Sequence, residues 1–204
     1  MTMNIGVIGT GKMGGTLGKL WADKGHQVLF GSRDLQKAKT MASTIGPSAT
    51  GGTYAEAAQF GEAVLFAVPW RVAQDVIQAA GNLTGKVLMD CTNPGATGLV
   101  AGQTSDAEEI ARWAVGARVV KAFNQIGYEN LSNPQFGSQQ ASTFICGDDE
   151  AAKSIVARLG EDIGFDVIDA GPLSNARLLE SLTMLWGQLA RKQGRNIAFK
   201  LLRR

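Results

Sequence analysis

The first residues that could do chemistry form a glycine-rich segment near the N-terminus, with the spacing G-x-G-x-x-G. Its six residues are Gly9, Thr10, Gly11, Lys12, Met13 and Gly14. In such a loop the first glycine permits a tight turn, the second lets the backbone approach a phosphate, and the third lets a helix lie close to a strand. The amide groups that open the helix would then face an anion. The spacing therefore predicts a loop that binds the diphosphate of a dinucleotide, in preference to a turn that binds nothing.

A second polar group follows the next predicted strand. Gly31-Ser32-Arg33 stands where NAD-binding folds carry an acidic residue for the ribose hydroxyls, and Lys37 follows one helical turn later. A 2′-phosphate would meet a hydroxyl, a guanidinium and an ammonium there, whereas a carboxylate would repel it. Asp34 lies one residue late and is expected in the first turn of the next helix, where it complements the helix dipole. We therefore predict NADP(H); the alternative is that Arg33 and Lys37 are solvated surface charges.

Three more strand ends could face the same cofactor, because ligands of doubly wound sheets lie beyond the carboxyl ends of the strands. The residues predicted to contact it there are Ala67, Val68, Pro69, Asn93, Pro94, Ala122 and Asn124. Val68 and Pro69 could form a wall along the cofactor, and Asn124 could bond a carboxamide. Each segment alone could be ordinary turn chemistry, but their shared location favours cofactor binding.

No residue set for acid–base or nucleophilic catalysis stands out, so no catalytic residue is predicted. The single histidine, His26, lies in the turn before the second predicted strand, and the strand ends carry no paired carboxylates. Oxidation of an alcohol needs a proton relay, usually His, Lys or Tyr. Hydride transfer between two redox cofactors needs mainly proximity and orientation. The sequence therefore favours transfer from one cofactor to another.

The two cysteines, Cys91 and Cys146, each end a predicted buried strand. Free core thiols are expected at such positions, and without a Cys/His cluster no metal site is predicted. Unpaired thiols are typical of a reducing compartment, so we expect a cytoplasmic protein.

Strands and helices alternate along almost the whole chain. Strands are expected at 4–8, 27–30, 63–67, 87–90, 119–122, 142–146 and 165–169, and helices at 13–24, 34–45, 53–59, 70–80, 105–114, 150–163 and 173–191. Asp148 is expected to cap the helix at 150–163, and Ser174 could cap the last one. This order predicts an α/β fold: a Rossmann-type, doubly wound, mostly parallel sheet with a C-terminal helical extension. We expect residues 1–204 to form a single NADP-binding domain, with about 170–204 at an acceptor site or a dimer contact.

The composition argues against two classes of partner. A net charge of +2 is too small to suggest nucleic acid or a membrane surface. No apolar stretch approaches the roughly 20 residues of a transmembrane helix, and no secretory leader is expected. A small-molecule redox cofactor is the expected partner, and an apolar face on the last helix also allows a homodimer. That face consists of Leu178, Leu179, Leu182, Leu185, Trp186 and Leu189.

Several segments extend the pattern beyond single motifs: IGTGKMGGTLG, GSRDLQK, FAVPW, and CGDD followed by DAGPLSNARLLESLT. Together they resemble the NADPH:coenzyme F420 oxidoreductase family over almost the whole chain, and the last segment is the most specific. A weaker similarity, which includes VKAFN, links the chain to the oxidoreductase domains of the six-transmembrane metalloreductases.

The resemblance implies NADP bound by the glycine loop, with Thr10, Ser32, Arg33 and Lys37 at its 2′-phosphate. It also implies a deazaflavin or flavin acceptor stacked near the nicotinamide. The residues that match regions near this acceptor are Pro69, Asn124, Pro172, Leu173, Ser174 and Asn175. Where the F420 reductases carry a histidine-containing segment, this chain has FNQI at 123–126, so F420, FMN, FAD and an unrelated acceptor all stay open.

Two other functions remain as alternatives. Reduction of a small imine or carbonyl would fit the N-terminal pattern, but such reductases typically carry a longer helical C-terminal region. A non-catalytic NADP(H)-sensing module would equally explain the missing acid–base residues.

Overall fold

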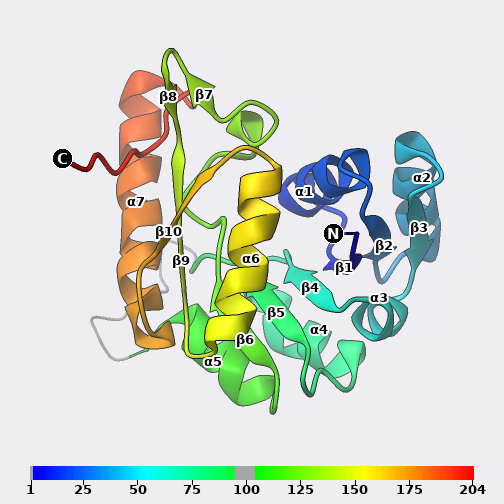
Figure 1. Ribbon diagram of the computed structural model, residues 1–204. Coiled ribbons are helices and arrows are strands. Elements are labelled where there is room, and N and C mark those ends of the chain that lie inside the picture. The colour runs from blue at the N-terminus through cyan, green and yellow to red at the C-terminus, as the bar shows by residue number, and fades with distance from the viewer. Residues whose placement is uncertain (1, 95–103) are drawn as a thin grey trace.

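The computed structural model describes residues 2–94 and 104–204 (Figure 1). The strands are β1 (Asn4–Ile8), β2 (Gln27–Gly31), β3 (Ala49–Gly52), β4 (Ala63–Phe66), β5 (Val87–Asp90), β6 (Arg118–Lys121), β7 (Gln135–Phe136), β8 (Gln139–Gln140), β9 (Ser142–Gly147) and β10 (Asp166–Asp169). The helices are α1 (Lys12–Asp23), α2 (Leu35–Ile45), α3 (Tyr54–Phe60), α4 (Ala73–Ala80), α5 (Asp106–Trp113), α6 (Glu150–Asp162) and α7 (Ala176–Gln193). Short 3₁₀ turns are η1 (Trp70–Val72), η2 (Tyr128–Asn130) and η3 (Leu173–Asn175).

One sheet holds eight of the strands in the order β10-β9-β6-β5-β4-β1-β2-β3. Neighbours from β3 to β6 are parallel, as are β9 and β10, whereas β6 and β9 are antiparallel. The strand order reverses between β1 and β4, and a crevice at such a switch point is where open α/β sheets bind ligands. The predicted doubly wound, mostly parallel fold is therefore confirmed, with one antiparallel pair that the pattern of elements did not reveal.

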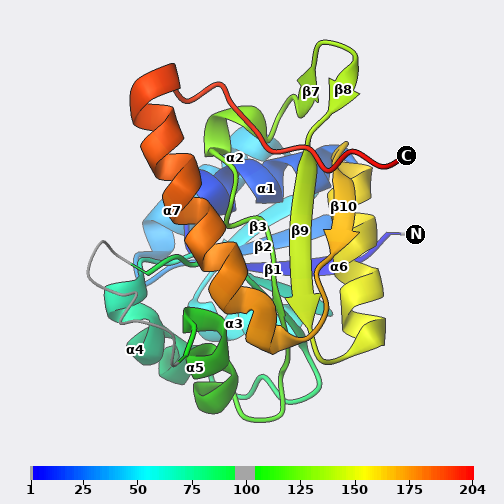
Figure 2. The same ribbon diagram turned by 90° about the vertical axis from the view of Figure 1, so that its left-hand side faces the viewer.

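Each face of the sheet carries its own apolar layer (Figures 1 and 2). Helices α1, α2 and α6 pack on one face, around Leu17, Trp21 and Val156. Helices α3, α4, α5 and α7 pack on the other, around Ile77 and Ile110. This arrangement explains why strands β4 and β5 are apolar at nearly every position: strands covered on both faces read as continuous apolar runs.

Local hydrogen bonds start most helices where the sequence suggests. Ser105 and Glu108 form the expected reciprocal capping box at α5. Two other caps differ from expectation. Asp34 precedes α2 as its N-cap and accepts a hydrogen bond from the Lys37 amide, so it is not a first-turn residue. Asp149, not Asp148, caps α6; Asp148 instead accepts a hydrogen bond from the Leu173 amide at 2.9 Å.

Several elements differ from the sequence-based expectation, which did not include the short paired strands β7 and β8. The short strand β3 was missed because its sequence, ATGG, has little β propensity. The helix expected at 70–80 begins with the turn η1, and regular α-helix starts only at Ala73. The last helix starts at Ala176, and Ser174 does not cap it, because Ser174 lies inside η3, where Asn175 N already donates to Pro172 O at 2.9 Å.

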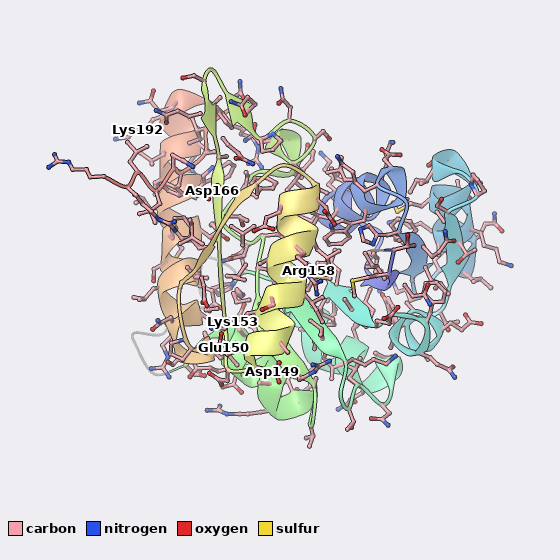
Figure 3. The ribbon with its side chains drawn as sticks, in the orientation of Figure 1. Asp149, Glu150, Lys153, Arg158, Asp166 and Lys192 are labelled. Carbon is pink, nitrogen blue, oxygen red and sulfur yellow. The ribbon has the colours of Figure 1, made fainter. Side chains whose placement is uncertain are left out.

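The segment after α7 turns back and crosses the starts of β9 and β10 (Figure 2). Ser142 N donates to Phe199 O at 2.9 Å, and the Lys200 ammonium lies 2.5 Å from Asp166. Glu150 and Arg158 of α6 are exposed, whereas Lys153 is buried, and its ammonium lies 2.8 Å from both Glu150 and Asp169 (Figure 3). None of the helices in the described part of the chain has the length and apolar character that a membrane crossing requires.

Candidate functional site

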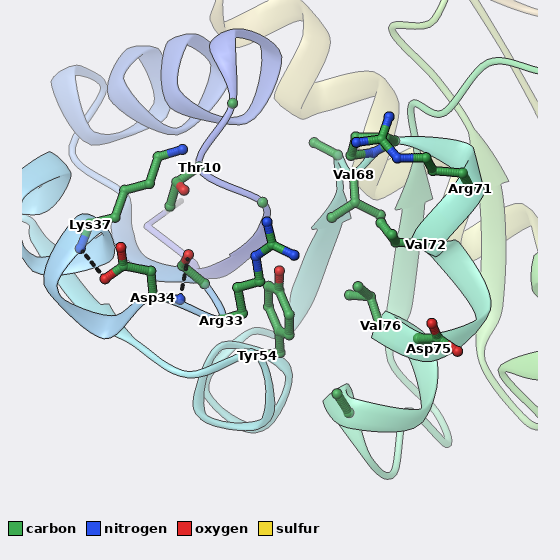
Figure 4. A pocket seen from close by; sticks show the side chains of 16 residues that line it. Thr10, Arg33, Asp34, Lys37, Tyr54, Val68, Arg71, Val72, Asp75 and Val76 are labelled. Carbon is green, nitrogen blue, oxygen red and sulfur yellow. Dashed lines mark hydrogen bonds between the residues drawn. The ribbon is translucent and has the colours of Figure 1, made fainter. Parts of the chain in front are cut away.

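A pocket of about 620 Å³ opens at the carboxyl ends of β1, β2 and β4, at the switch point of the sheet (Figure 4). Nine of the predicted residues line it: Gly9, Thr10, Gly11, Ser32, Arg33, Lys37, Ala67, Val68 and Pro69. The tertiary structure therefore brings together three predicted segments that lie far apart in the chain.

The glycine loop has the geometry that its spacing predicts. Gly9 has φ +116°, which other residues rarely adopt, and a Cβ there would lie 2.4 Å from Ala67 O. A Cβ on Gly14 would lie 2.2 Å from Gly9 O, so helix α1 can approach β1 only with glycine at this position. A Cβ on Gly11 would meet no protein atom within 4 Å, so the backbone there faces open space. Lys12, Met13 and Gly14 form the start of α1 and do not line the pocket.

The corner after β2 places four polar or charged groups at one end of the pocket (Figure 4). Ser32 is buried, and its hydroxyl accepts a hydrogen bond from Asp34 N at 3.1 Å. Arg33 and Lys37 are exposed, and Lys37 extends toward Thr10. The Asp34 carboxylate accepts from Lys37 N at 3.1 Å, so it is engaged in capping α2.

The opposite wall was missed by sequence reasoning. It consists of Arg71, Val72, Asp75, Val76 and Ala79, and a further lining residue that was not predicted, Tyr54, lies beside Arg33 on the near side (Figure 4). Val72, Val76 and Ala79 recur at helical spacing along η1 and α4, and form a small apolar strip. The amphipathic pattern of 70–80 was visible in the sequence, but which strand ends it would face depends on the crossover from β4.

Asn124 has a structural role that its position alone did not reveal. Its amide nitrogen lies 3.1 Å from Asn93 Oδ1, 3.1 Å from Leu179 O and 2.8 Å from Thr183 Oγ1, so it ties the ends of β5 and β6 to α7. Its amide oxygen is buried and has no hydrogen-bond partner among the described residues. The expected bond from Asn124 to a carboxamide stays a prediction, and only this oxygen could accept it.

The residue before Asn124 holds an unusual backbone conformation. Phe123 has φ +58°, which is costly for an aromatic residue. Its ring is fully buried and packs edge-on against Trp21, with centroids 5.9 Å apart. The packed ring holds the backbone in place, and the turn directs Asn124 toward α7.

The remaining predicted residues lie outside the pocket wall. They are Asn93, Pro94, Ala122, Asn124, Pro172, Leu173, Ser174 and Asn175. In the turn before α7, Leu173 is buried and Asn175 Nδ2 donates to Ala170 O at 2.6 Å. Both contacts build the start of α7, and the acceptor contact expected of this turn stays a prediction.

A buried ion cluster lies under the ends of β5 and β6. The Lys121 ammonium is 2.9 Å from Asp90 Oδ2, 2.9 Å from Glu180 Oε1 and 2.7 Å from Thr92 O, and the three side chains are at most 1% exposed. Burial alone would lower the pKa of Lys121, but the charges of Asp90 and Glu180 outweigh it and raise that pKa. Asp90 and Lys121 are paired in register at the ends of two apolar strands, which is the sequence signal that could have revealed this pair.

The cluster extends to the start of α5. Glu180 Oε2 accepts a hydrogen bond from Asp106 N at 3.2 Å, and the Asp106 side chain is itself buried with Oδ2 unpaired among the described residues. Burial and then the charge of Glu180 raise the pKa of Asp106 to about 7, against the attraction of Lys121. Asp106 therefore keeps its proton far above the usual pH range of an aspartate.

The thiols of Cys91 and Cys146 are protonated and unreactive at neutral pH. Burial raises the pKa of Cys91 to about 12 and that of Cys146 to about 12. Neither is a thiolate at neutral pH, and only a thiolate is an effective nucleophile.

Comparison with known proteins identifies relatives along almost the whole chain. A family model for coenzyme F420-dependent NADP oxidoreductases matches residues 4–94. The F420-dependent NADP reductase of Methanothermobacter marburgensis is 33% identical over 203 residues, which cover 90% of this chain and 90% of that protein. The F420-dependent NADP reductase of Methanothermobacter thermautotrophicus is 34% identical over 91% of this chain and 88% of that protein. The metalloreductase STEAP3 of Rattus norvegicus is 30% identical over 88% of this chain, but the chain spans only 36% of its length.

Solved structures also include proteins similar to this chain. A candidate F420-dependent NADP reductase from Arthrobacter sp. FB24 superposes with a TM-score of 0.88 at 33% identity, covering 98% of this chain and 100% of that one. A reductive aminase from Aspergillus terreus, in complex with NADPH, gives a TM-score of 0.70 at 20% identity and is covered to 63% of its length. This second likeness concerns the fold alone.

The buried carboxyl of Asp106 generates a stability prediction. Because its pKa rises from 3.8 to about 7 on folding, the native state holds this proton more tightly than the unfolded chain does. The resulting stabilisation is complete below about pH 4 and is lost as the pH rises through about 7. The free energy of unfolding of Asp106→Asn, measured by urea denaturation, should therefore fall less between pH 4 and 8 than that of the wild type.

Asp23→Asn is the matched control, since Asp23 is an exposed aspartate on α1 paired with Lys19. It should keep the wild-type pH dependence. An Asp106→Asn curve parallel to that of the wild type would contradict the raised pKa.

Proposed function

Since the chain belongs to the coenzyme F420-dependent NADP oxidoreductase family, we propose that it transfers hydride between NADPH and a deazaflavin or flavin acceptor. The protein is an NADP(H)-dependent oxidoreductase, and the proposal concerns the acceptor and the residues that bind each molecule. The similarity to reductive aminases and imine reductases lies in the fold alone, so it does not favour a small imine as substrate.

The diphosphate of NADP(H) is assigned to the loop from Gly9 to Gly11. The first amides of α1 have no side-chain cap, and the first turn contains no acidic residue, so the positive end of the helix is free to face an anion. The open space over Gly11 is what a backbone in contact with phosphate needs.

The 2′-phosphate is assigned to the corner formed by Thr10, Ser32, Arg33 and Lys37. The observation that carries the cofactor assignment is the convergence of two hydroxyls, a guanidinium and an ammonium on one end of the pocket (Figure 4). Asp34, the carboxylate beside them, is engaged in capping α2 and so leaves the cations available. Charged groups of this kind favour a phosphate over the bare ribose hydroxyl of NAD.

The adenine is assigned to the space between the two walls of the pocket. The strip of Val72, Val76 and Ala79 offers an apolar surface, and Arg33 and Arg71 face the pocket from opposite sides (Figure 4). A planar base suits such a slot, because guanidinium groups stack well on aromatic rings.

The nicotinamide end then extends past Ala67, Val68 and Pro69 toward the ends of β5 and β6. When bound, NADPH supplies a hydride and becomes NADP⁺, while the acceptor takes up that hydride together with one proton from solvent. The role of the chain in this proposal is to position the two molecules, with the nicotinamide and acceptor rings in contact at the strand ends. This proximity is the main requirement for such a hydride transfer.

Arg33→Ala tests the cofactor assignment. Loss of one charged hydrogen bond, worth about 1.5–3 kcal/mol, should weaken NADPH binding by roughly 10- to 100-fold and weaken NADH binding much less, because NADH loses only the stacking of Arg33 on the adenine. Isothermal titration calorimetry with both nucleotides measures this. Arg158→Ala, an exposed arginine on α6, is the matched control and should alter neither affinity. Equal losses for NADPH and NADH would remove the 2′-phosphate from this corner.

An acceptor screen tests the proposed reaction. NADPH oxidation, followed by its absorbance, should proceed with F420, FMN or FAD and be negligible with small imines and carbonyls. Tight NADPH binding without turnover of any flavin or deazaflavin would instead point to a sensing module.

The outer side of α7 supports a second proposal, that two copies of the chain pair through this helix. Leu178, Leu182, Leu185 and Leu189 follow one another at spacings of four, three and four residues, which is the repeat of a two-helix seam. Leu178 is 65% exposed and Leu185 51% exposed, so this row is not covered by the chain itself.

Leu185→Glu tests the pairing. A buried carboxylate at the centre of the seam should convert a dimer to a monomer in size-exclusion chromatography with light scattering. Leu202→Glu, at a more exposed leucine of the C-terminal segment, should leave the mass unchanged. A wild-type protein that is monomeric at micromolar concentration would exclude this interface.

A further inference from the structure

Lys12 belongs to the glycine loop but does not line the pocket. Its ammonium donates a hydrogen bond to the Tyr128 hydroxyl at 2.7 Å, across 116 positions of the chain. Among the described residues this ammonium has no carboxylate partner, unlike Lys19 on the same helix, which pairs with Asp23 at 2.6 Å. Lys12 therefore presents an uncompensated charge beside an aromatic ring.

A second cation lies over the same ring. Arg195, just beyond α7, lies with its guanidinium carbon 5.9 Å from the Tyr128 ring centroid and 4.9 Å from that of Trp186. Glu129 holds the guanidinium through contacts of 2.6 and 3.2 Å. The backbone here is anchored as well, because Asn130 Nδ2 donates to Arg195 O at 2.9 Å. The cluster is thus held in place by tertiary contacts.

The electrostatics of this cluster favour an anion. Lys12 is the first residue of α1, where the helix dipole is positive and a cation is unfavourable unless an anion is nearby. The two cations outnumber the single carboxylate of Glu129. A phosphate placed here would relieve the repulsion between Lys12 and the helix end.

The position of the cluster indicates which molecule would carry that anion. Tyr128 follows β6, which lies two strands beyond β4, whereas the basic corner lies one strand beyond β1 on the other side. A dinucleotide with its 2′-phosphate in that corner extends across the glycine loop toward β5 and β6. The cluster therefore borders the side on which a second cofactor must approach the nicotinamide.

We propose that Lys12, Tyr128 and Arg195 bind the phosphate on the side chain of the hydride acceptor, and so select phosphorylated flavins or deazaflavins over their unphosphorylated cores. This inference rests on the proposed function, because it assumes that the acceptor has a flavin-type ring. Lys12 and Arg195 supply the charge, and the Tyr128 hydroxyl holds the Lys12 ammonium in place.

Two pairs of acceptors test the phosphate site: FMN with riboflavin, which differ by the phosphate alone, and F420 with its deazariboflavin core, which differ by the whole phosphorylated side chain. Binding of each to the NADP⁺-loaded protein is measured by calorimetry or flavin fluorescence. The wild type should bind the phosphorylated member of at least one pair more tightly. Lys12→Met should reduce that preference by about tenfold or more, as expected for loss of one charged hydrogen bond, and Tyr128→Phe should reduce it by less. Lys19→Met, on the same helix, should keep the wild-type preference.

Three results would overturn the inference. The first is that the wild type binds both members of each pair equally. The second is that Lys12→Met weakens NADP⁺ binding while the preference stays unchanged, which would assign Lys12 to the diphosphate of the dinucleotide. The third is that no acceptor binds. Turnover of NADPH with riboflavin or the deazariboflavin core keeps the proposed function even when the inference fails. Absence of turnover with all four acceptors removes the proposed function itself.

Discussion

Helix α1 and the turn after β1 approach each other so closely that only glycine fits between them, and the pocket at the switch point of the sheet depends on this contact. A Cβ at Gly14 would lie 2.2 Å from Gly9 O, and one at Gly9 would lie 2.4 Å from Ala67 O. Because the helix starts against the strand, its first amides lie at the carboxyl edge of the sheet. The ends of β2 and β4 then close the pocket from either side.

The packing of α7 against β5 and β6 depends on the buried charge of Lys121. Lys121 has no exposed surface, and an isolated ammonium in that position would be strongly destabilising. Asp90 and Glu180 compensate it, and Glu180 comes from α7. Docking of α7 is therefore coupled to the ends of β5 and β6, and Asn124 adds hydrogen bonds between the same elements. This network holds the C-terminal helix beside the carboxyl ends of β5 and β6.

The two halves divide the work of an NADP(H)-dependent oxidoreductase. In the proposed function the glycine loop and the basic corner after β2 serve the dinucleotide, and both are short-range features. The proposed acceptor side is assembled from residues of α1, η2, α7 and the turn after β6, which meet only in the folded chain.

The sequence alone determined the alternation of strands and helices, the glycine loop and the Ser32, Arg33 and Lys37 corner, because these depend on neighbouring residues and on local periodicity. Tertiary structure alone decided the antiparallel pairing of β6 with β9, the wall formed by α4, and the Lys121 cluster. It also decided which residues meet Lys12. These contacts join positions up to 116 residues apart, and their partners depend on how the crossovers stack the elements, which local pattern does not encode.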